Sequence, residues 1–445
     1  MTMTMTKTEI IAAIRTVLTE RLNNRHVGAF APQARLGPDL ALDSLMTMNL
    51  LLFLETDHGL VAPEAAIATR AAETVEEFAD LFLAVPEEAA APPAEIVAHN
   101  AADEAARREG VHGEDYVDIK VHCFVSCVAD AMKRAPGIDQ RPLYFGVWDA
   151  PFITGDGSFV KYHEPGMRQE FFRTWAERLY GCTVRAWYDE ARTKAENTAI
   201  MKRLLAARTA HEDVMVMLDM FHLPGRENIF NKNPFPHYLL LERTEDPATW
   251  LVRDVDYRWE GRMPAADVVD AIEQPSVEGG YLIDRSTAHP PRRDDLAAYF
   301  EACIERDRNP LIEALRRILD VHSGIGGSLA ALEAAVAEFP ILLVRKYAYE
   351  HGFAVFWRAL ERDSASFEAW CDEIEALIQG LRALNYDLLK LSRTEDRTLL
   401  PAVRAALDAL DRREFAIKAG LIEAYAAWWA ATAETAQPVR ETVAG

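Results

Sequence analysis

The chain has 445 residues, half of them hydrophobic, and a formal net charge of −22 at neutral pH. That length exceeds what one hydrophobic core organises and predicts about two to four domains, while the acidic charge argues against nucleic acid or an anionic membrane as a partner. No apolar run reaches the roughly 18 residues that a membrane-spanning helix needs, and residues 1–6 lack the basic and apolar stretches of a secretory signal. The cysteines show neither a CxxC pair nor zinc-ligand spacing with histidine, so we expect free thiols, no metal site and a cytoplasmic location.

Residues 1–84 are predicted to form a small helical domain. Apolar residues recur at helical spacing over 10–18 and indicate a first amphipathic helix. A loop with prolines and glycine follows, and a second helix begins at Ser44. The last helix begins after Thr74, whose side chain we expect to cap it together with Glu77.

The rest of the chain falls into four segments. Residues 85–115 are rich in Ala, Pro and Glu and cannot bury a core, which predicts a linker. Residues 116–289 mix helical segments with apolar runs typical of strands and indicate an α+β domain, whose strand candidates are Val214–Leu218, His237–Leu241 and Trp250–Val252. Residues 290–435 show helical patterns almost throughout, and residues 436–445 are expected to be a disordered tail. The predicted fold class is therefore multidomain, combining α and α+β units.

Ser44 lies in a short motif, Asp43-Ser44-Leu45, where the second predicted helix begins. A serine hydroxyl at an exposed helix N-terminus suits a phosphodiester, because the backbone amides and the helix dipole favour negative charge there. The motif, the upstream Leu36-Gly37 and the downstream Gly59-Leu60 resemble an acyl or peptidyl carrier protein, a four-helix bundle. The resemblance implies 4′-phosphopantetheine attached to Ser44 by a phosphopantetheinyl transferase, and a separate adenylating enzyme that loads the acyl group.

A second set of residues has the chemistry of a cysteine nucleophile. Cys123 begins a predicted buried helix whose dipole would stabilise a thiolate, and such a nucleophile needs a histidine base and an orienting group. His237 opens one predicted strand and Asp254 closes the next, so a hairpin would bring the two together. Asp256 follows on the same face of the strand and is the alternative acid. Cys127, one turn after Cys123, is expected to be a small core residue.

The order of these residues and several short runs resemble a known acyltransferase family. The runs are HC at 122–123, PLYFG at 142–146, LDMFHLP at 218–224 and the pair HYLLLE…LVRD. They are similar to the butirosin side-chain acyltransferase family and to the petrobactin-biosynthesis condensing proteins. The resemblance implies a C39-peptidase-like, papain-related domain with a helical C-terminal region, which moves an acyl group from a carrier protein to an amine.

In that resemblance Cys123 is the nucleophile, His237 the base and Asp254 the orienting acid. Papain-like peptidases place an oxyanion-hole glutamine a few residues before the cysteine, whereas this chain has Val-Asp-Ile-Lys at 117–120. The oxyanion must then be stabilised by backbone amides near Cys123 or by another side chain.

The helical region 290–435 would act as a substrate domain and as a lid against water. The remaining candidates, expected to be structural or to line the pocket, are His122, His163 and His222.

The sequence therefore predicts an acyltransferase with its carrier built in, which joins an acyl or aryl group to an amine in secondary-metabolite or siderophore biosynthesis. A polyamine acceptor suits the acidic charge of the chain. Two alternatives stay open: a thioesterase or cysteine hydrolase of the same fold that releases the acyl group to water, and a non-catalytic carrier scaffold. Free acid released without any amine would favour the hydrolase.

Overall fold

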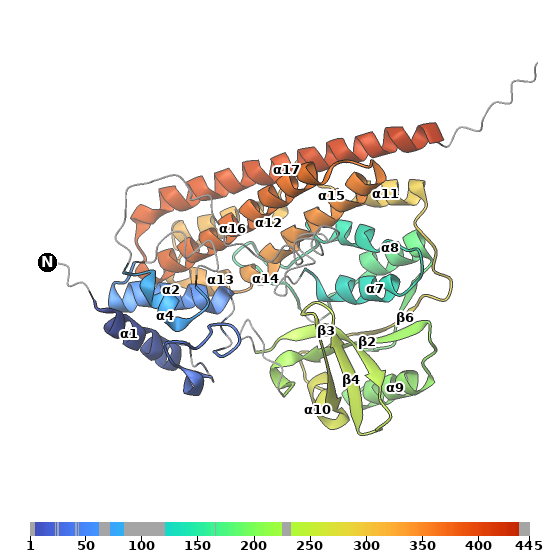
Figure 1. The fold of residues 1–445 in the computed structure, drawn as a ribbon, viewed down its shortest axis with the longest axis horizontal. Coiled ribbons are helices and arrows are strands. Elements are labelled where there is room, and N and C mark those ends of the chain that lie inside the picture. Colours follow the sequence, from blue (N-terminus) through green and yellow to red (C-terminus); the bar gives the residue numbers. More distant parts are fainter. Residues whose placement is uncertain are drawn as a thin grey trace, which may run out of the picture.

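The computed structural model has a helical unit at the N-terminal end of the chain, a sheet with its helices in the middle, and long helices at the C-terminal end (Figure 1). It describes residues 5–22, 24, 26–40, 42, 44–61, 72–83, 121–164, 166–224 and 233–435, and for Ser44, Leu45, Glu434 and Thr435 the backbone alone. Helical units with one six-stranded antiparallel sheet agree with the expected multidomain α and α+β class. The predicted linker 85–115 and tail 436–445 lie outside the described residues.

The N-terminal unit contains, in its described part, the helices α1 (Lys7–Glu20), α2 (Ser44–His58) and α4 (Val75–Asp80), with a 3₁₀-helix η1 (Val27–Ala29). The predicted cap of the last helix is confirmed: the Glu77 amide donates to the Thr74 hydroxyl at 3.3 Å, and the Thr74 amide donates to the Glu77 carboxylate at 3.2 Å. The first predicted helix and the start of the second at Ser44 are also confirmed. Residues 62–71 lie outside the described chain, and the four-helix carrier bundle stays a prediction.

Six strands form one antiparallel sheet in the order β1-β6-β2-β3-β4-β5. They are β1 (Thr183–Ala186), β2 (Glu212–Asp219), β3 (Pro236–Arg243), β4 (Thr249–Asp254), β5 (Trp259–Pro264) and β6 (Gly280–Asp284). In β2 and β3 successive residues enter different cores: Met215 and Tyr238 belong to one, Val216 and Leu239 to the other. Burial on both faces explains why these strands are continuous apolar runs in the sequence.

Helices cover both faces of the sheet (Figure 1). On one face lie α7 (Cys123–Lys133) and α8 (Glu170–Tyr180), and on the other α9 (Lys194–Ala207) and α10 (Ala265–Ile272). Two 3₁₀-helices, η2 (Arg141–Gly146) and η3 (Met220–His222), lie in the connections. The sheet is therefore the middle layer of a sandwich of helices, and the start of α7 lies close to the start of β3.

The C-terminal region packs around α15 (Ala348–Ala359), which is buried along most of its length and contacts the two longest helices, α16 (Ser364–Thr394) and α17 (Leu400–Thr435). The other helices are α11 (Arg293–Cys303), α12 (Pro310–Ser323), η4 (Leu329–Ala331), α13 (Leu332–Ala335), α14 (Phe339–Leu343), η5 (Val344–Tyr347) and η6 (Arg397–Leu399). Among the described helices, none combines the length and the apolarity that crossing a membrane requires.

A buried cluster of four charges connects the sheet domain to these helices. Lys346 lies between Asp149 at 2.8 Å and Glu414 at 2.6 Å, and Lys418 approaches the second oxygen of Asp149 at 2.8 Å. All four side chains are almost completely buried. Two cations and two anions balance in this cluster, so each charge is compensated by a partner despite the loss of water.

Asp149→Asn should lower the free energy of unfolding by about 3–5 kcal/mol, because it leaves Lys346 and Lys418 buried without their shared carboxylate. Asp408→Asn is the matched control, since its ion pair with Arg316 at 2.8 Å is exposed and should contribute less than about 1 kcal/mol. Urea unfolding of both variants measures the difference. Equal losses in the two variants would show that the buried cluster does not hold the domains together.

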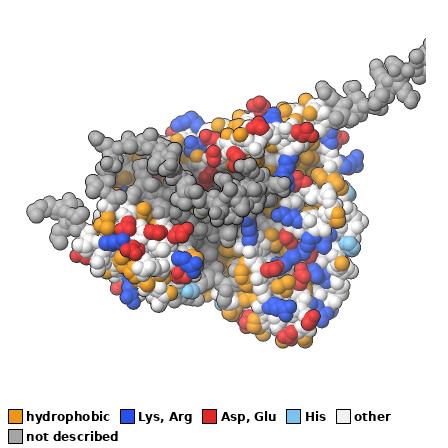
Figure 2. All heavy atoms as spheres, viewed as in Figure 1, with side chains coloured by type: hydrophobic (Ala, Val, Ile, Leu, Met, Phe, Trp, Pro, Cys, Tyr) orange, Lys and Arg blue, Asp and Glu red, His pale blue; other side chains and the backbone are white. Residues whose placement is uncertain are grey.

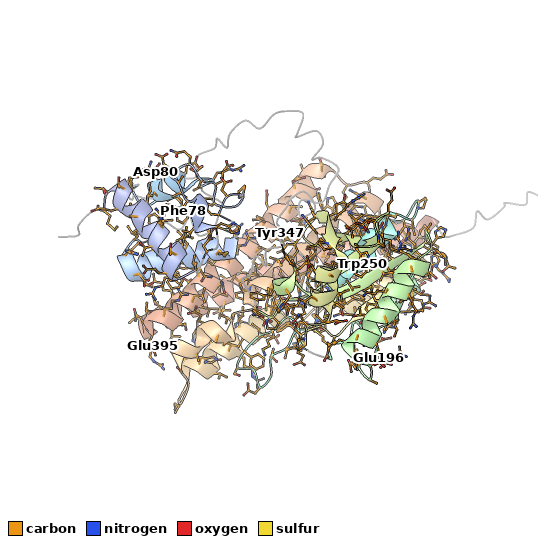
Figure 3. All side chains as sticks on the ribbon, turned by 90° about the horizontal axis from the view of Figure 1, so that it is seen from below. Phe78, Asp80, Glu196, Trp250, Tyr347 and Glu395 are labelled. Carbon is orange, nitrogen blue, oxygen red and sulfur yellow. The ribbon has the colours of Figure 1, made fainter. Side chains whose placement is uncertain are left out.

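The N-terminal unit lies beside the far end of the long helices (Figure 1). In the view from below, Phe78 of this unit lies at the same end of the molecule as Glu395, the residue after α16, whereas Trp250 of the sheet lies toward the other end (Figure 3). Both views therefore place the N-terminal helices next to the end of α16 rather than on the sheet.

Contacts between α2 and α16 hold the unit there. Lys390 of α16 pairs with Glu55 of α2 at 2.6 Å, and the Tyr386 hydroxyl donates a hydrogen bond to the same carboxylate. The Arg393 guanidinium lies 3.9 Å from the centre of the Phe53 ring. Charge pairing and a cation–π contact both contribute to this interface. Its stability therefore depends on these side chains as well as on apolar burial.

Charges of both signs are mixed on the surface of the sheet domain, as Figure 2 shows for one face. Many charges of this domain pair with each other, for example Arg208 with Glu242 at 3.3 Å. The net charge of −22 therefore does not gather into one acidic patch on the face shown. Surface charge does not mark a polyamine site on that face.

Candidate active site

Cys123 is the first residue of α7, and an aspartate fixes that end of the helix. The Asp256 carboxylate accepts hydrogen bonds from the Val121 amide at 3.1 Å, the His122 amide at 3.2 Å and the Ser126 hydroxyl at 2.8 Å. A carboxylate is favoured at this position because the helix N-terminus carries a partial positive charge. Burial raises the pKa of Asp256, and these hydrogen bonds oppose that effect. Asp256 thereby holds the segment that carries the thiol of Cys123.

The strand pair β3–β4 brings His237 and Asp254 together. Leu240 lies opposite Arg253 in the antiparallel register, so the start of β3 meets the end of β4. The His237 Nε2 atom lies 2.9 Å from the Asp254 Oδ1 atom, and both side chains are buried. This contact leaves Nδ1 as the ring nitrogen that is available to Cys123, which lines the same pocket.

The protonated form of His237 is favoured in this setting. Burial alone would lower the pKa of His237, but the charges at Asp254 and Cys123 outweigh it and raise that pKa well above its ordinary value. An imidazolium between a carboxylate and a sulfur is the arrangement that favours a cysteine thiolate. The three residues can therefore act as nucleophile, base and orienting acid.

Aromatic rings hold the imidazole of His237 in place. The Phe235 ring is stacked on it at 6.0 Å, and the Tyr257 ring meets it edge-on at 5.2 Å. Phe235 is itself fixed by Asp219, whose buried carboxylate accepts the Phe235 amide hydrogen bond at 2.9 Å. The imidazole thus has little freedom to turn away from Asp254.

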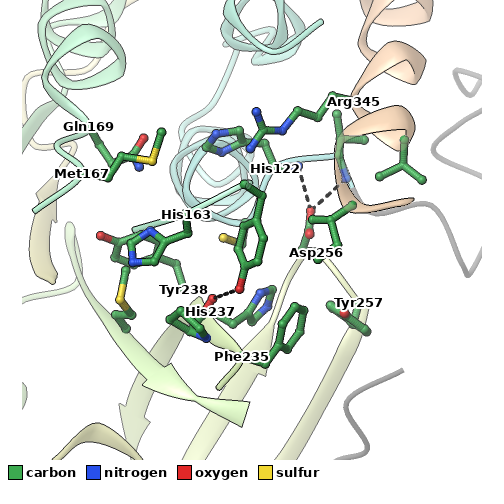
Figure 4. Close-up of a pocket in the computed structure, with 17 residues that line it drawn as sticks. His122, His163, Met167, Gln169, Phe235, His237, Tyr238, Asp256, Tyr257 and Arg345 are labelled. Atoms are coloured by element: carbon green, nitrogen blue, oxygen red, sulfur yellow. Dashed lines mark hydrogen bonds between the residues drawn. The ribbon is translucent and has the colours of Figure 1, made fainter. Parts of the chain in front are cut away.

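A pocket lies over Cys123 and His237 (Figure 4). Its other polar lining residues are His122, Tyr162, His163, Gln169, Tyr238, Asp256, Tyr257 and Arg345. Burial lowers the pKa of His163 to about 4, and burial together with the charge of Arg345 lowers the pKa of His122 well below its ordinary value, so both rings are neutral. Next to the thiol the pocket therefore presents neutral polar rings together with two charged side chains, Asp256 and Arg345.

Two family models match this chain, the DUF6005 N-terminal domain over residues 118–288 and the DUF6005 C-terminal domain over residues 294–442. The chain belongs to the DUF6005 family. It is similar to petrobactin synthase of Bacillus anthracis, with 36% identity over 312 residues that cover 70% of this chain and 95% of the relative. This DUF6005 protein thus matches a biosynthetic enzyme over nearly that enzyme's whole length, and it is the longer of the two chains.

The structure of this DUF6005 protein brings three of the four proposed site residues together: Cys123, His237 and Asp254. Ser44 is the first residue of α2 in another part of the molecule, and its side chain lies outside the described atoms. Asp256, the alternative acid, is the acceptor at the start of α7 instead. Cys127 is buried in the core as expected, and burial raises the pKa of its thiol well above the ordinary value.

Of the further histidines, His122 and His163 line the pocket, whereas His222 lies in η3 and is not part of the lining. The polar residues of this DUF6005 pocket that sequence reasoning missed include Gln169 and Arg345. A signal for Arg345 exists, because it is charged within the apolar run 341–349, and charged residues are rarely buried without a specific reason.

Proposed function

We propose that this DUF6005 protein is an acyltransferase that moves an acyl or aryl group from its own carrier domain to an amine and forms an amide. The observation that supports this best is the contact of His237 with Asp254 at 2.9 Å beside Cys123 at the base of a pocket. The similarity to petrobactin synthase supports a role for the chain in siderophore biosynthesis, and thus a biosynthetic rather than a degradative enzyme.

The proposed reaction has two steps at Cys123. Its thiolate attacks the carbonyl carbon of an acyl thioester, the thioester bond breaks, and the departing thiol takes a proton from His237. The acyl-cysteine is then attacked by an amine nitrogen, which loses its proton to His237 as the amide forms and the Cys123 thiolate leaves. Asp254 keeps the imidazole oriented and stabilises its protonated form during both steps.

The described backbone at Ser44 fits a carrier serine. Ser44 is the first residue of α2, where helix amides favour a phosphodiester. Attached there, 4′-phosphopantetheine would supply the thioester that holds the acyl group. A phosphopantetheinyl transferase and an adenylating enzyme are the partners that this proposal requires.

The contacts between α2 and α16 support a carrier that works with the rest of its own chain. Glu55 pairs with Lys390, and Phe53 lies against Arg393, so the helix that Ser44 begins docks on the end of α16 in the helical region. A tethered domain reaches a high effective concentration at its partner site without a tight interface. Such docking favours an acyltransferase over a stand-alone hydrolase.

Loading of the full-length protein tests the proposal. Incubation with acetyl-coenzyme A and a broad-specificity phosphopantetheinyl transferase should add one acetyl-phosphopantetheine by intact mass, in the wild type and in the control Thr47→Ala but not in Ser44→Ala. Spermidine added as a probe amine should then yield acetylspermidine rather than free acetate. Failure of the wild type to load would contradict the built-in carrier, and release of acetate at the same rate without spermidine would indicate the hydrolase.

A further inference from the structure

Arg345 brings a buried positive charge from the C-terminal helices to the pocket. It lies in η5, its side chain is only 6% exposed, and it lines the pocket with Cys123. Its Nη1 atom donates to the carbonyl oxygens of Ala150 and Pro151, each at 3.2 Å. These two carbonyls orient the guanidinium, but they carry no full negative charge.

Among the described residues, no carboxylate lies within 4.0 Å of this guanidinium. The acidic residue of the same pocket, Asp256, is occupied as acceptor for two amides and the Ser126 hydroxyl. His122 lies next to Arg345 (Figure 4), and its ring is neutral. Arg345 is therefore a cation that faces the pocket without a close ion pair to a carboxylate of the described residues.

A buried charge without a counter-ion has a large desolvation cost. Every other buried cation of this kind in the helical region, such as Lys346 and Lys418, has a carboxylate partner. Burial lowers the pKa of Arg345 to about 10, while the charges at Cys123 and Asp256 raise it, so the side chain stays protonated at neutral pH. The charges that act on Arg345 belong to Cys123 and Asp256 of the same pocket, so the guanidinium lies close to the reacting groups.

We propose that Arg345 is a catalytic residue that stabilises the negative charge on the carbonyl oxygen of the tetrahedral intermediate formed when Cys123 attacks a thioester. This inference rests on the proposed function. In this role Arg345 takes the place of the glutamine that papain-like peptidases have before the cysteine, where this chain has Val-Asp-Ile-Lys. The Cys123 amide, in the first turn of α7 and without an intrahelical partner, supplies the second hydrogen bond.

Residues of both family domains then form the catalytic site. Cys123, His237 and Asp254 come from the region that matches the N-terminal family model, whereas Arg345 comes from the region that matches the C-terminal one. Gln169 also presents a polar side chain to the pocket, but as a neutral group it needs no anion to offset its burial. The helical region then takes part in the chemistry in addition to covering the site.

Single-turnover transfer to spermidine tests this with the loaded full-length protein. Arg345→Met, which keeps length and apolar bulk, should slow transfer by roughly 10²- to 10³-fold, and Arg345→Lys should slow it less. Guanidinium ion should restore part of the rate to Arg345→Ala. Arg285→Met is the matched control, because Arg285 is a similarly buried arginine that pairs with Asp213 at 2.7 Å on the sheet, and its rate should stay within threefold of wild type.

Two acyl groups distinguish this role from recognition of an anionic substrate. Arg345→Met should slow transfer by the same factor with acetyl and with succinyl loaded on the carrier, because both acyl groups form the same oxyanion. A slower rate with succinyl alone would overturn the proposal in favour of an acyl-carboxylate site. A wild-type rate in Arg345→Met with both acyl groups would overturn it as well. A slow transfer rate that guanidinium does not restore, accompanied by a lower unfolding midpoint, would also overturn the proposal. If the wild type loads but forms no acetylspermidine, the proposed function itself fails, so the two failures are separable.

Discussion

Cys123→Ala should abolish acyl transfer, lowering the single-turnover rate of the loaded protein by a factor on the order of 10⁴ or more. Alanine removes the nucleophile but keeps the helix start, since Asp256 bonds to the backbone of residues 121 and 122 and to Ser126. His237 and Asp254 then remain in contact without a sulfur to activate. Carrier loading at Ser44 should be unchanged, which separates a defect in transfer from a defect in loading.

Cys127→Ala is the matched control for this result. Cys127 lies one turn further along α7 and is buried in the core, and its thiol has a raised pKa that disfavours the thiolate. Transfer should stay within about threefold of wild type, because the substitution removes only one small buried group. If Cys123→Ala kept a rate within tenfold of wild type, the amine would be attacking the carrier thioester directly and the nucleophile assignment would be wrong.

Asp254→Asn should lower the transfer rate by roughly 10²- to 10⁴-fold. Two effects add: the amide fixes the imidazole less well, and it removes the negative charge that opposes burial of the His237 cation. The sign follows from the raised pKa of His237 in the wild type. Without the carboxylate, burial dominates and the imidazolium loses its proton at a lower pH, so the alkaline limb of the pH–rate profile should move to lower pH.

Asp246→Asn provides the comparison, because Asp246 lies in the exposed turn between β3 and β4 and bonds only to groups of that turn. Its rate and its pH profile should match the wild type. The profile is measured by single-turnover transfer between pH 5 and pH 10 in the loaded protein. An alkaline limb in Asp254→Asn that coincides with the wild-type limb would mean that Asp254 does not set the protonation of His237.

Local chemistry made parts of this fold predictable. The Thr74–Glu77 cap and the apolar runs of β2 and β3 are signals carried by a few adjacent residues, and the structure contains them at those positions. The edge strands were not predicted. β1 is only four residues long, and β5 is half exposed and contains Gly261 and Pro264, so neither has the apolar pattern of a strand.

The candidate site was predictable only in part, for the same reason. Cys123, His237 and Asp254 could be selected because a helix start and two consecutive strands place them, although the sequence left Asp254 and Asp256 as alternatives. The structure separates them through the hydrogen bonds of Asp256 to the start of α7. Arg345 reaches the pocket only because the helical region packs on the sheet domain, and no local pattern encodes that packing.

The central claim is that the acyl group passes through Cys123. The full-length protein is loaded with an acetyl group at Ser44, kept without amine, quenched with acid and digested, and the peptides are weighed. The account predicts an acetyl group on the peptide that contains Cys123, absent in His237→Ala and removed when spermidine is added before the quench. An acetyl group found only on the Ser44 peptide, in a sample that still forms acetylspermidine at the wild-type rate, would contradict it.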